Sequence, residues 1–266
     1  VVEPFEIPSF WPKFVIIDWG FRAMCWVGFF AVSPNKRLYL YKELTWTKTK
    51  IAEWGPIVKN SDTFDTVRFI KVCKSAGQDR GQDHTIQGEI ERELGRPVEL
   101  TLNTPGSRIS GKMNFHEYLR WMPKPQPKQT EKPIYSEEYA MRIYRLQGQQ
   151  AYETYLHLFD EPIVETNIPK YQILCCKDEN GSIDIDHEGH SNCCPEAIKA
   201  IKACEYPKNH SGSDKPVEDV AEFSGDDPYD GQRYGVDAAE QLFEDAAEEF
   251  IKFEKQTNLE KKLIAT

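Results

Sequence analysis

The sequence predicts an α/β fold in which a mixed central sheet is flanked by helices. Three observations lead to this expectation: three strand-like segments lie close together near the start of the chain, a fourth follows after a helical segment, and helical periodicity dominates the later part. The 266 residues are enough to bury a substantial core. We expect a single domain over 1–266, with a linker and helical insertion at 123–170 and an acidic C-terminal helix at 237–266.

The first three predicted strands are 14–18 (FVIID), 23–32 (AMCWVGFFAV) and 37–46 (RLYLYKELTW). All three are rich in β-branched and aromatic residues, and turn-forming residues separate them. Because the connections are short, we expect an antiparallel meander.

A helix and a buried strand come next. Residues 48–59 have apolar side chains at helical spacing, although Gly55-Pro56 should kink or shorten that helix. Residues 66–73 (TVRFIKVC) form an apolar run, as expected of a strand covered on both faces. A further helix is predicted over 83–94, with Gly95 as its C-terminal stop.

The later elements are predicted from the same signals. A proline-rich spacer at 123–133 precedes an inserted helix at 136–159, whose aromatic and aliphatic face we expect to be buried. The other expected elements are strands at 98–102 and 171–177 and helices at 114–121, at 195–203 and from Asp227 onward.

Composition restricts the possible functions. The net charge of −10 and the pI of about 5.2 have the wrong sign for a protein that coats nucleic acid through a basic surface. Any contact with DNA would therefore have to be local or mediated by metal. The chain starts at Val1 without a charged leader or an apolar run that could cross a membrane, so we expect a soluble fragment of a longer protein with no membrane partner. Seven cysteines without a signal sequence favour a reducing, intracellular compartment.

The later cysteines allow two interpretations. Cys175-Cys176 and Cys193-Cys194 are adjacent pairs with His187 and His190 between them, which would suit zinc. Zinc sites prefer two to four residues between the members of a pair, so the signal is weak. The alternative is that the first pair ends a buried strand and the second starts a helix, with the thiols acting as small apolar groups.

GSRISGKM at 106–113 matches a phosphate-binding loop except at its last position. Met113 stands where a Ser or Thr hydroxyl should hold magnesium, and the second acidic strand motif of an ATPase is missing, so an ATPase is not expected. We predict a loop here. It either brings Arg108 and Lys112 to a DNA phosphate backbone or is an ordinary solvated basic turn.

The order of the predicted elements is that of a ribonuclease H-like fold. In this topology the first and fourth strands are parallel neighbours, and carboxylates at their carboxyl ends meet a third from a later helix at one rim of the sheet. Asp18 ends the first strand, and Asp226, Asp227 and Asp230 crowd the start of the last helix. A helix start favours carboxylates, with Asp226 or Asp227 as the cap and Pro228 at the first helical position. A divalent metal would offset their repulsion further.

Three segments carry a family resemblance. These are IIDWGF at 16–21, the strand and AG-containing loop at 67–77, and VEDVAEFSGDDPYDGQRYG at 217–235. Together they resemble the C-terminal nuclease domain of the large terminase subunit of tailed bacteriophages. The resemblance covers about Val1 to Gly235, is strongest at its two ends and is thin across 123–170.

The resemblance implies a metal-dependent endonuclease that cuts concatemeric double-stranded viral DNA. Asp18 and Asp227 would ligate metal, with Asp230 as a supporting or alternate ligand. Two Mg or Mn ions roughly 4 Å apart would catalyse phosphodiester hydrolysis. The implied partners are double-stranded DNA, an N-terminal ATPase domain, the small terminase subunit and the portal protein, in the host cytoplasm.

Lys74 departs from the family's pattern, which normally has an acid at this catalytic position. An ammonium group cannot ligate a metal ion, and it would pair with Asp18 or Asp227 instead. Three explanations stay open: Asp79 or Asp83 supplies the ligand, the natural protein has lost activity, or the chain carries an inactivating substitution. Lys74 could also simply extend into solvent.

Two alternatives to a terminase nuclease remain. One is a non-catalytic DNA-binding or assembly module whose acidic helix, with an apolar stripe along 237–255, docks a partner. We expect that stripe to pack on the chain's own sheet rather than on a partner. The other is a resolvase-like junction nuclease on the same fold, which would prefer branched DNA.

Overall fold

A computed structural model describes the chain except residue 62 and residues 79–84, 102–106, 121–136, 157–168, 179–192, 205–225 and 265–266. Its centre is a six-stranded sheet in the order β5-β4-β1-β2-β3-β6. The strands are β1 Lys13–Asp18, β2 Met24–Val32, β3 Leu38–Thr47, β4 Val67–Val72, β5 Glu99–Leu100 and β6 Tyr171–Ile173.

The pairing of the strands confirms the predicted fold class. β1 pairs antiparallel with β2, and β2 pairs antiparallel with β3. β4 pairs parallel with β1, and β5 pairs parallel with β4. This is the strand order of a ribonuclease H-like fold, and it makes β1 and β4 parallel neighbours. The short β6 extends the sheet beyond β3, also in parallel.

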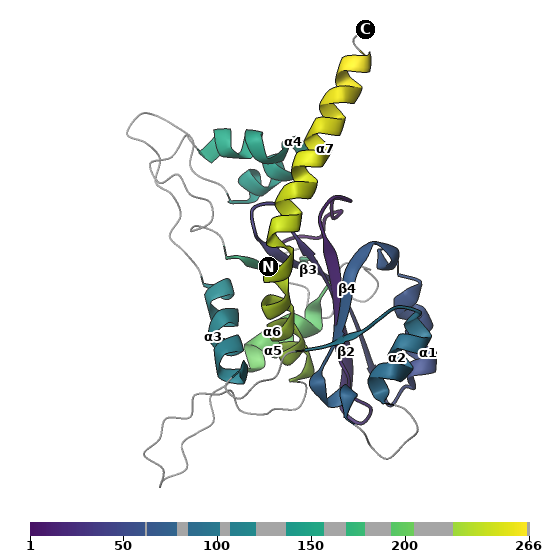
Figure 1. Cartoon of the computed structure of the whole chain (residues 1–266). Coiled ribbons are helices and arrows are strands. Elements are labelled where there is room, and N and C mark those ends of the chain that lie inside the picture. The colour runs from purple at the N-terminus through teal and green to yellow at the C-terminus, as the bar shows by residue number, and fades with distance from the viewer. Residues whose placement is uncertain are drawn as a thin grey trace, which may run out of the picture.

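Helices cover both faces of the sheet (Figure 1). Helices α1, α2 and α4 contribute buried residues to the core on one face, and α3, α5, α6 and the start of α7 to the core on the other. Their bounds are α1 Ile51–Lys59, α2 Ile86–Leu94, α3 Ser107–Leu119, α4 Glu137–Leu156, α5 Pro195–Ala203, α6 Asp227–Ala239 and α7 Phe243–Ile264. Alternate residues of β1 point to opposite cores: Val15 and Ile17 to the first, Phe14 and Ile16 to the second.

Several helices differ from their predicted extents. α1 starts at Ile51, so the predicted helix is shortened at its N-terminal end, and it continues through Pro56. α4 is broken at Gly148, whose φ of 82° lies in the region that favours glycine. The long acidic helix is two helices, α6 and α7, joined by the 3-10 turn η4 Glu240–Leu242.

The prediction of a loop at GSRISGKM is wrong, because α3 already begins at Ser107. Gly111 serves helix packing in this run. A Cβ at this position would lie 2.8 Å from Oδ2 of Asp237 on α6. The missing side chain therefore lets α3 approach α6 closely.

The apolar stripe of 237–255 packs largely on its own chain. Leu242 and Ala246 are buried in the second core. Phe250 packs against Phe10, with ring centroids 5.8 Å apart, whereas Ile251 is 50% exposed. Among the helices that the structure describes, none has both the length and the apolarity to span a bilayer.

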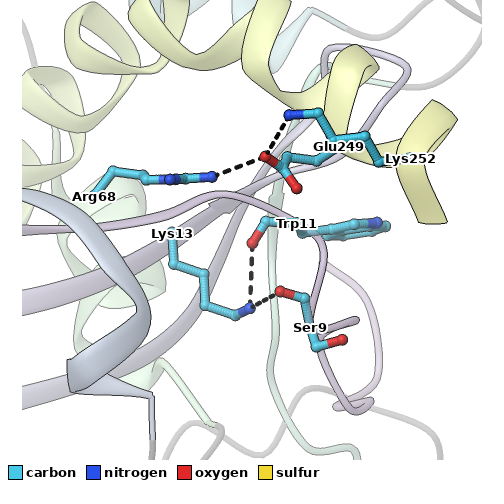
Figure 2. A network of polar contacts seen from close by, with 6 residues as sticks. All are labelled: Ser9, Trp11, Lys13, Arg68, Glu249 and Lys252. Carbon is cyan, nitrogen blue, oxygen red and sulfur yellow. Dashed lines mark hydrogen bonds and ion pairs between the residues drawn. The ribbon is translucent and has the colours of Figure 1, made fainter.

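Polar contacts fix the chain around the start of β1 (Figure 2). The buried ammonium group of Lys13 donates to the backbone carbonyls of Pro8, Ser9 and Trp11 at 3.1, 3.4 and 3.2 Å. Nearby, Arg68 of β4 forms an ion pair with Glu249 of α7 at 3.2 Å. Because that pair is exposed, we expect it to contribute less than about 1 kcal/mol.

The burial of Lys13 predicts a pH-dependent contribution to stability. Burial lowers the pKa of Lys13 from 10.5 to about 8. Between these values the unfolded state binds more protons at this position, so Lys13 makes the free energy of unfolding rise with pH, by roughly 3 kcal/mol across the whole window. We expect Lys13→Met to lose this rise, measured by guanidinium unfolding at pH 7.5, 8.5 and 9.5. Lys50→Met controls for the loss of one exposed positive charge, and an unchanged slope in Lys13→Met would contradict the prediction.

Candidate functional site

The carboxyl ends of β1 and β4 lie side by side. Ile17 is paired with Val72, and the N–H of Cys73 donates to the carbonyl of Ile17 at 3.0 Å. Asp18, the last residue of β1, therefore lies next to Cys73 at the rim of the sheet. The parallel pairing predicted for the first and fourth strands produces this arrangement.

Helix α6 brings its acidic N-terminus to the same rim. It starts at Asp227, with Asp226 at the N-cap position and Pro228 as the second helical residue rather than the first. The carboxylate of Asp227 accepts a hydrogen bond from the N–H of Met24, the first residue of β2. This contact anchors the helix start on the strand that pairs with β1.

These elements border a half-open cavity of about 260 Å³. It is lined by Asp18, Trp19, Cys73, Lys74, Ser75, Asp226, Asp227, Asp230 and Tyr234. The structure thus brings together Asp18 and the three aspartates at the start of α6, and it places Lys74 beside them. Asp79 and Asp83, the alternative sources of a ligand, lie outside the described residues.

The aspartates raise one another's pKa. Burial raises the pKa of Asp18 to about 8, and the charges of Asp230, Asp227 and Asp226 add to this shift. Burial likewise raises the pKa of Asp227 to about 6, together with the charges of Asp226 and Asp230. Ionising the whole cluster without a counter-charge is therefore unfavourable.

Asp230 has a counter-charge within its own helix. Nη2 of the buried Arg233 lies 3.1 Å from Oδ1 of Asp230, one turn earlier on α6. The guanidinium group also lies over the ring of Tyr234, 5.0 Å from its centroid. Asp230 is therefore held by a buried cation, which suits a supporting carboxylate better than a main ligand.

Cys73 is a member of the site that sequence reasoning missed. Its sulfur accepts the N–H of Trp19 at 3.3 Å, and its thiol donates to the carboxylate of Asp18. Burial and the charge of Asp18 raise the pKa of Cys73 to about 12, so it remains a thiol. Its place at the end of the fourth predicted strand was the available signal, one position before Lys74.

Lys74 opens the 3-10 turn η2, Lys74–Gly77, directly after Cys73. Its side chain is exposed and lines the acidic cavity. A positive charge therefore stands at the rim where the carboxylates repel one another.

The donor set fits a hard divalent cation. Carboxylate oxygens are the preferred ligands of Mg²⁺ and Mn²⁺, and a cation would lower the raised pKa values of Asp18 and Asp227. In the part of the chain that the structure describes, however, no three His, Cys, Asp or Glu side chains are already spaced to hold a metal ion. Binding would therefore require the side chains to draw together.

The other predicted site residues lie elsewhere. Lys112 is on α3, is only 5% exposed and does not line the acidic cavity. The side chain of Arg108 lies outside the described residues. Contact of these two residues with DNA stays a prediction, and the burial of Lys112 does not favour it.

The late cysteines follow the packing interpretation. Cys175 and Cys193 are buried, and Cys194 is the N-cap residue of α5. The sulfur of Cys193 accepts the N–H of Cys176 at 2.7 Å. His187 and His190 lie outside the described residues. Within the described residues, no group of three His, Cys, Asp or Glu side chains is spaced to hold a metal ion.

No family model matches the sequence, and no curated protein matches it. The structure is similar to solved nuclease domains of large terminases. The g2p nuclease domain from bacteriophage SPP1 with bound Mn has a TM-score of 0.47 and 11% identity, with 85% of each chain covered. The P22 large terminase nuclease domain has a TM-score of 0.40 and 11% identity, over 88% of this chain and 84% of that one.

The large terminase from the thermophilic bacteriophage D6E has a TM-score of 0.47 and 12% identity. The alignment covers 89% of the present chain but 41% of that protein. At these identities and TM-scores, the likeness is limited to the general fold.

The raised pKa of Asp18 predicts how acid affects stability. Between pH 3.8 and about 8 the folded state binds more protons at Asp18 than the unfolded state does, so its contribution to stability falls as pH rises. We expect Asp18→Asn to raise the free energy of unfolding at pH 8 by about 1 to 3 kcal/mol and to change it little at pH 4. Chemical denaturation in the presence of a chelator measures both values. Asp245→Asn, an exposed change on α7, is the control, and equal effects of Asp18→Asn at the two pH values would refute the assignment.

Proposed function

We propose that this chain is a divalent-cation-dependent endonuclease domain that hydrolyses phosphodiester bonds of double-stranded DNA. One observation carries the proposal: Asp18 and Asp227, far apart in the sequence, line a single cavity at the carboxyl rim of the sheet. Desolvated carboxylates that raise one another's pKa are typical of functional sites. If these carboxylates served stability alone, we would expect each of them to have a positively charged partner.

In this proposal Asp18 and Asp227 hold the cations, and Asp230 supports them. The thiol of Cys73 orients Asp18, and Arg233 orients Asp230. A two-metal centre would supply an activated water and would neutralise charge on the phosphate and the leaving oxygen.

The sequence resemblance extends the proposal to a large terminase that cuts concatemeric viral DNA. The partners would then be an ATPase domain, the small terminase subunit and the portal protein in the host cytoplasm. With a net charge of −10, this chain would need local contacts or partner subunits to hold DNA. Arg108 and Lys112 remain the candidate contacts.

Lys74 bears directly on activity. Its ammonium group cannot ligate metal, and it lines the cavity that the cations would enter. We therefore propose that the chain as it stands has weak or no nuclease activity. The same observation favours the second candidate function, a non-catalytic DNA-binding or assembly module.

Lys74→Asp distinguishes the two functions. We expect weak or undetectable Mn²⁺ binding by the unchanged chain in calorimetric titration, because Lys74 competes with the cation. Lys74→Asp should restore binding and should nick supercoiled plasmid in a chelator-sensitive manner. Lys74→Ala separates loss of the ammonium from gain of a ligand, and Lys74→Asp combined with Asp18→Asn should be inactive.

Two results would count against the nuclease. Tight Mn²⁺ binding by the unchanged chain would overturn the role given to Lys74. Absence of chelator-sensitive nicking by Lys74→Asp would favour the binding module, and faster cutting of branched than of linear DNA would indicate a junction nuclease.

Cation binding should also depend on pH. Because the pKa of Asp18 is raised to about 8 and that of Asp227 to about 6, a cation must displace protons at lower pH. We expect the Mn²⁺ affinity of Lys74→Asp to increase by at least about tenfold between pH 6 and pH 8. Titrations in buffers of different ionisation enthalpy would count the protons released. A flat affinity over this range would exclude these carboxylates as ligands.

A further inference from the structure

Trp26 separates the sheet from helix α6. Its indole is fully buried, and it lies between Gly28 on β2 and Gly231 on α6. A Cβ at Gly28 would lie 2.1 Å from the ring, and one at Gly231 would lie 2.4 Å from it. Neither position tolerates a side chain without movement, so the ring fills the whole gap between strand and helix.

Trp26 is a neighbour of the acidic site in both the sheet and the helix packing. Trp26 is the antiparallel partner of Asp18 in the sheet. Gly231 follows Asp230 and lies one turn after Asp227, so Asp227 and Gly231 share a face of α6. The height of α6 over the ring therefore sets how far its aspartates stand from Asp18.

Glu43 locks the orientation of the indole. Its carboxylate accepts the indole N–H of Trp26 at 2.8 Å and the N–H groups of Glu196 and Ala197, at the start of α5, at 2.6 and 3.0 Å. These hydrogen bonds keep the ring from tilting away from α6. One buried carboxylate thus joins β3, the indole of Trp26 and α5.

Gln232 connects α5 back to α6. Its side chain is fully buried and donates to the carbonyls of Ala197 and Pro228 at 3.1 and 2.8 Å. It also accepts the hydroxyl of Tyr171 at 2.9 Å. Gln232 therefore holds α6 against α5, and the indole sets the distance of α6 from the sheet.

We propose that Trp26 is a positioning residue whose indole, held by Glu43, sets the separation between Asp18 and the aspartates of α6 and thereby the affinity of the site for divalent cations. The inference rests on the proposed function. A second pair on the same helix provides a comparison, since Gly235 packs on Phe30, with a Cβ there 2.5 Å from the ring. That pair lies one turn farther from Asp227. A change there should therefore disturb the packing of α6 without moving its aspartates.

The test is a size-compensation experiment in the Lys74→Asp background. Gly231→Ala adds a methyl group against the benzo edge of the indole and should lift α6, whereas Trp26→Phe removes that edge and the hydrogen bond to Glu43. We expect each change to weaken Mn²⁺ binding by about tenfold or more, and the double variant to recover to within about threefold of the parent. Gly235→Ala is the matched control. It should lower thermal stability and leave the affinity within about threefold of the parent.

The affinities decide the outcome. Losses that simply add in the double variant, or an equal loss in Gly235→Ala, would show that Trp26 only fills the core. If Gly231→Ala does not fold, Trp26→Phe is compared with Phe30→Leu, and equal affinities in that pair overturn the inference.

A structural readout separates this inference from the proposed function. Crystal structures of the variants give the Cα separation of Asp18 and Asp227, which should increase in Gly231→Ala and return in the double variant. If the parent binds no cation, the proposed function fails, and this distance alone decides whether Trp26 positions α6. An unchanged distance in Gly231→Ala overturns the inference.

Discussion

Repulsion among the aspartates at the rim of β1 is the constraint on which the rest of the site depends. Burial and neighbouring charges raise the pKa of Asp18 to about 8 and that of Asp227 to about 6. A surface position would let water screen these carboxylates, whereas the cavity keeps them close and partly desolvated. The packing around them must therefore be strong enough to hold the helix start against the strand end.

The fold supplies that packing from both directions. Parallel pairing fixes Asp18 of β1 beside the end of β4, and close glycine contacts fix α6 over β2. Buried polar groups add directionality that apolar packing lacks, since Glu43 and Gln232 each join three elements. Such buried networks specify a unique arrangement when every member is hydrogen-bonded.

The chain relieves the repulsion in three chemically different ways. Arg233 forms an ion pair with Asp230, the thiol of Cys73 donates to Asp18, and the side chain of Lys74 borders the same cavity. A divalent cation would be a fourth and stronger way, and it would compete with Lys74 for the same space. The contacts that stabilise the aspartates without a cation would therefore weaken cation binding. Such a trade-off between stability and activity is common.

The sequence by itself determined the meander of β1, β2 and β3, the acid that ends β1 and the helix that starts at Asp227, because β-branched runs, turn residues and helix-start signals act locally. It did not place β5 and β6 at the two edges of the sheet. It misassigned GSRISGKM, since the close approach that Gly111 permits depends on α6, which is distant in the sequence. Tertiary structure alone decided that Lys112 is buried, that Cys73 joins the site and that Trp26 separates α6 from the sheet. These features arise from contacts between segments far apart in the chain. The periodicity of one segment does not specify which distant segment packs against it.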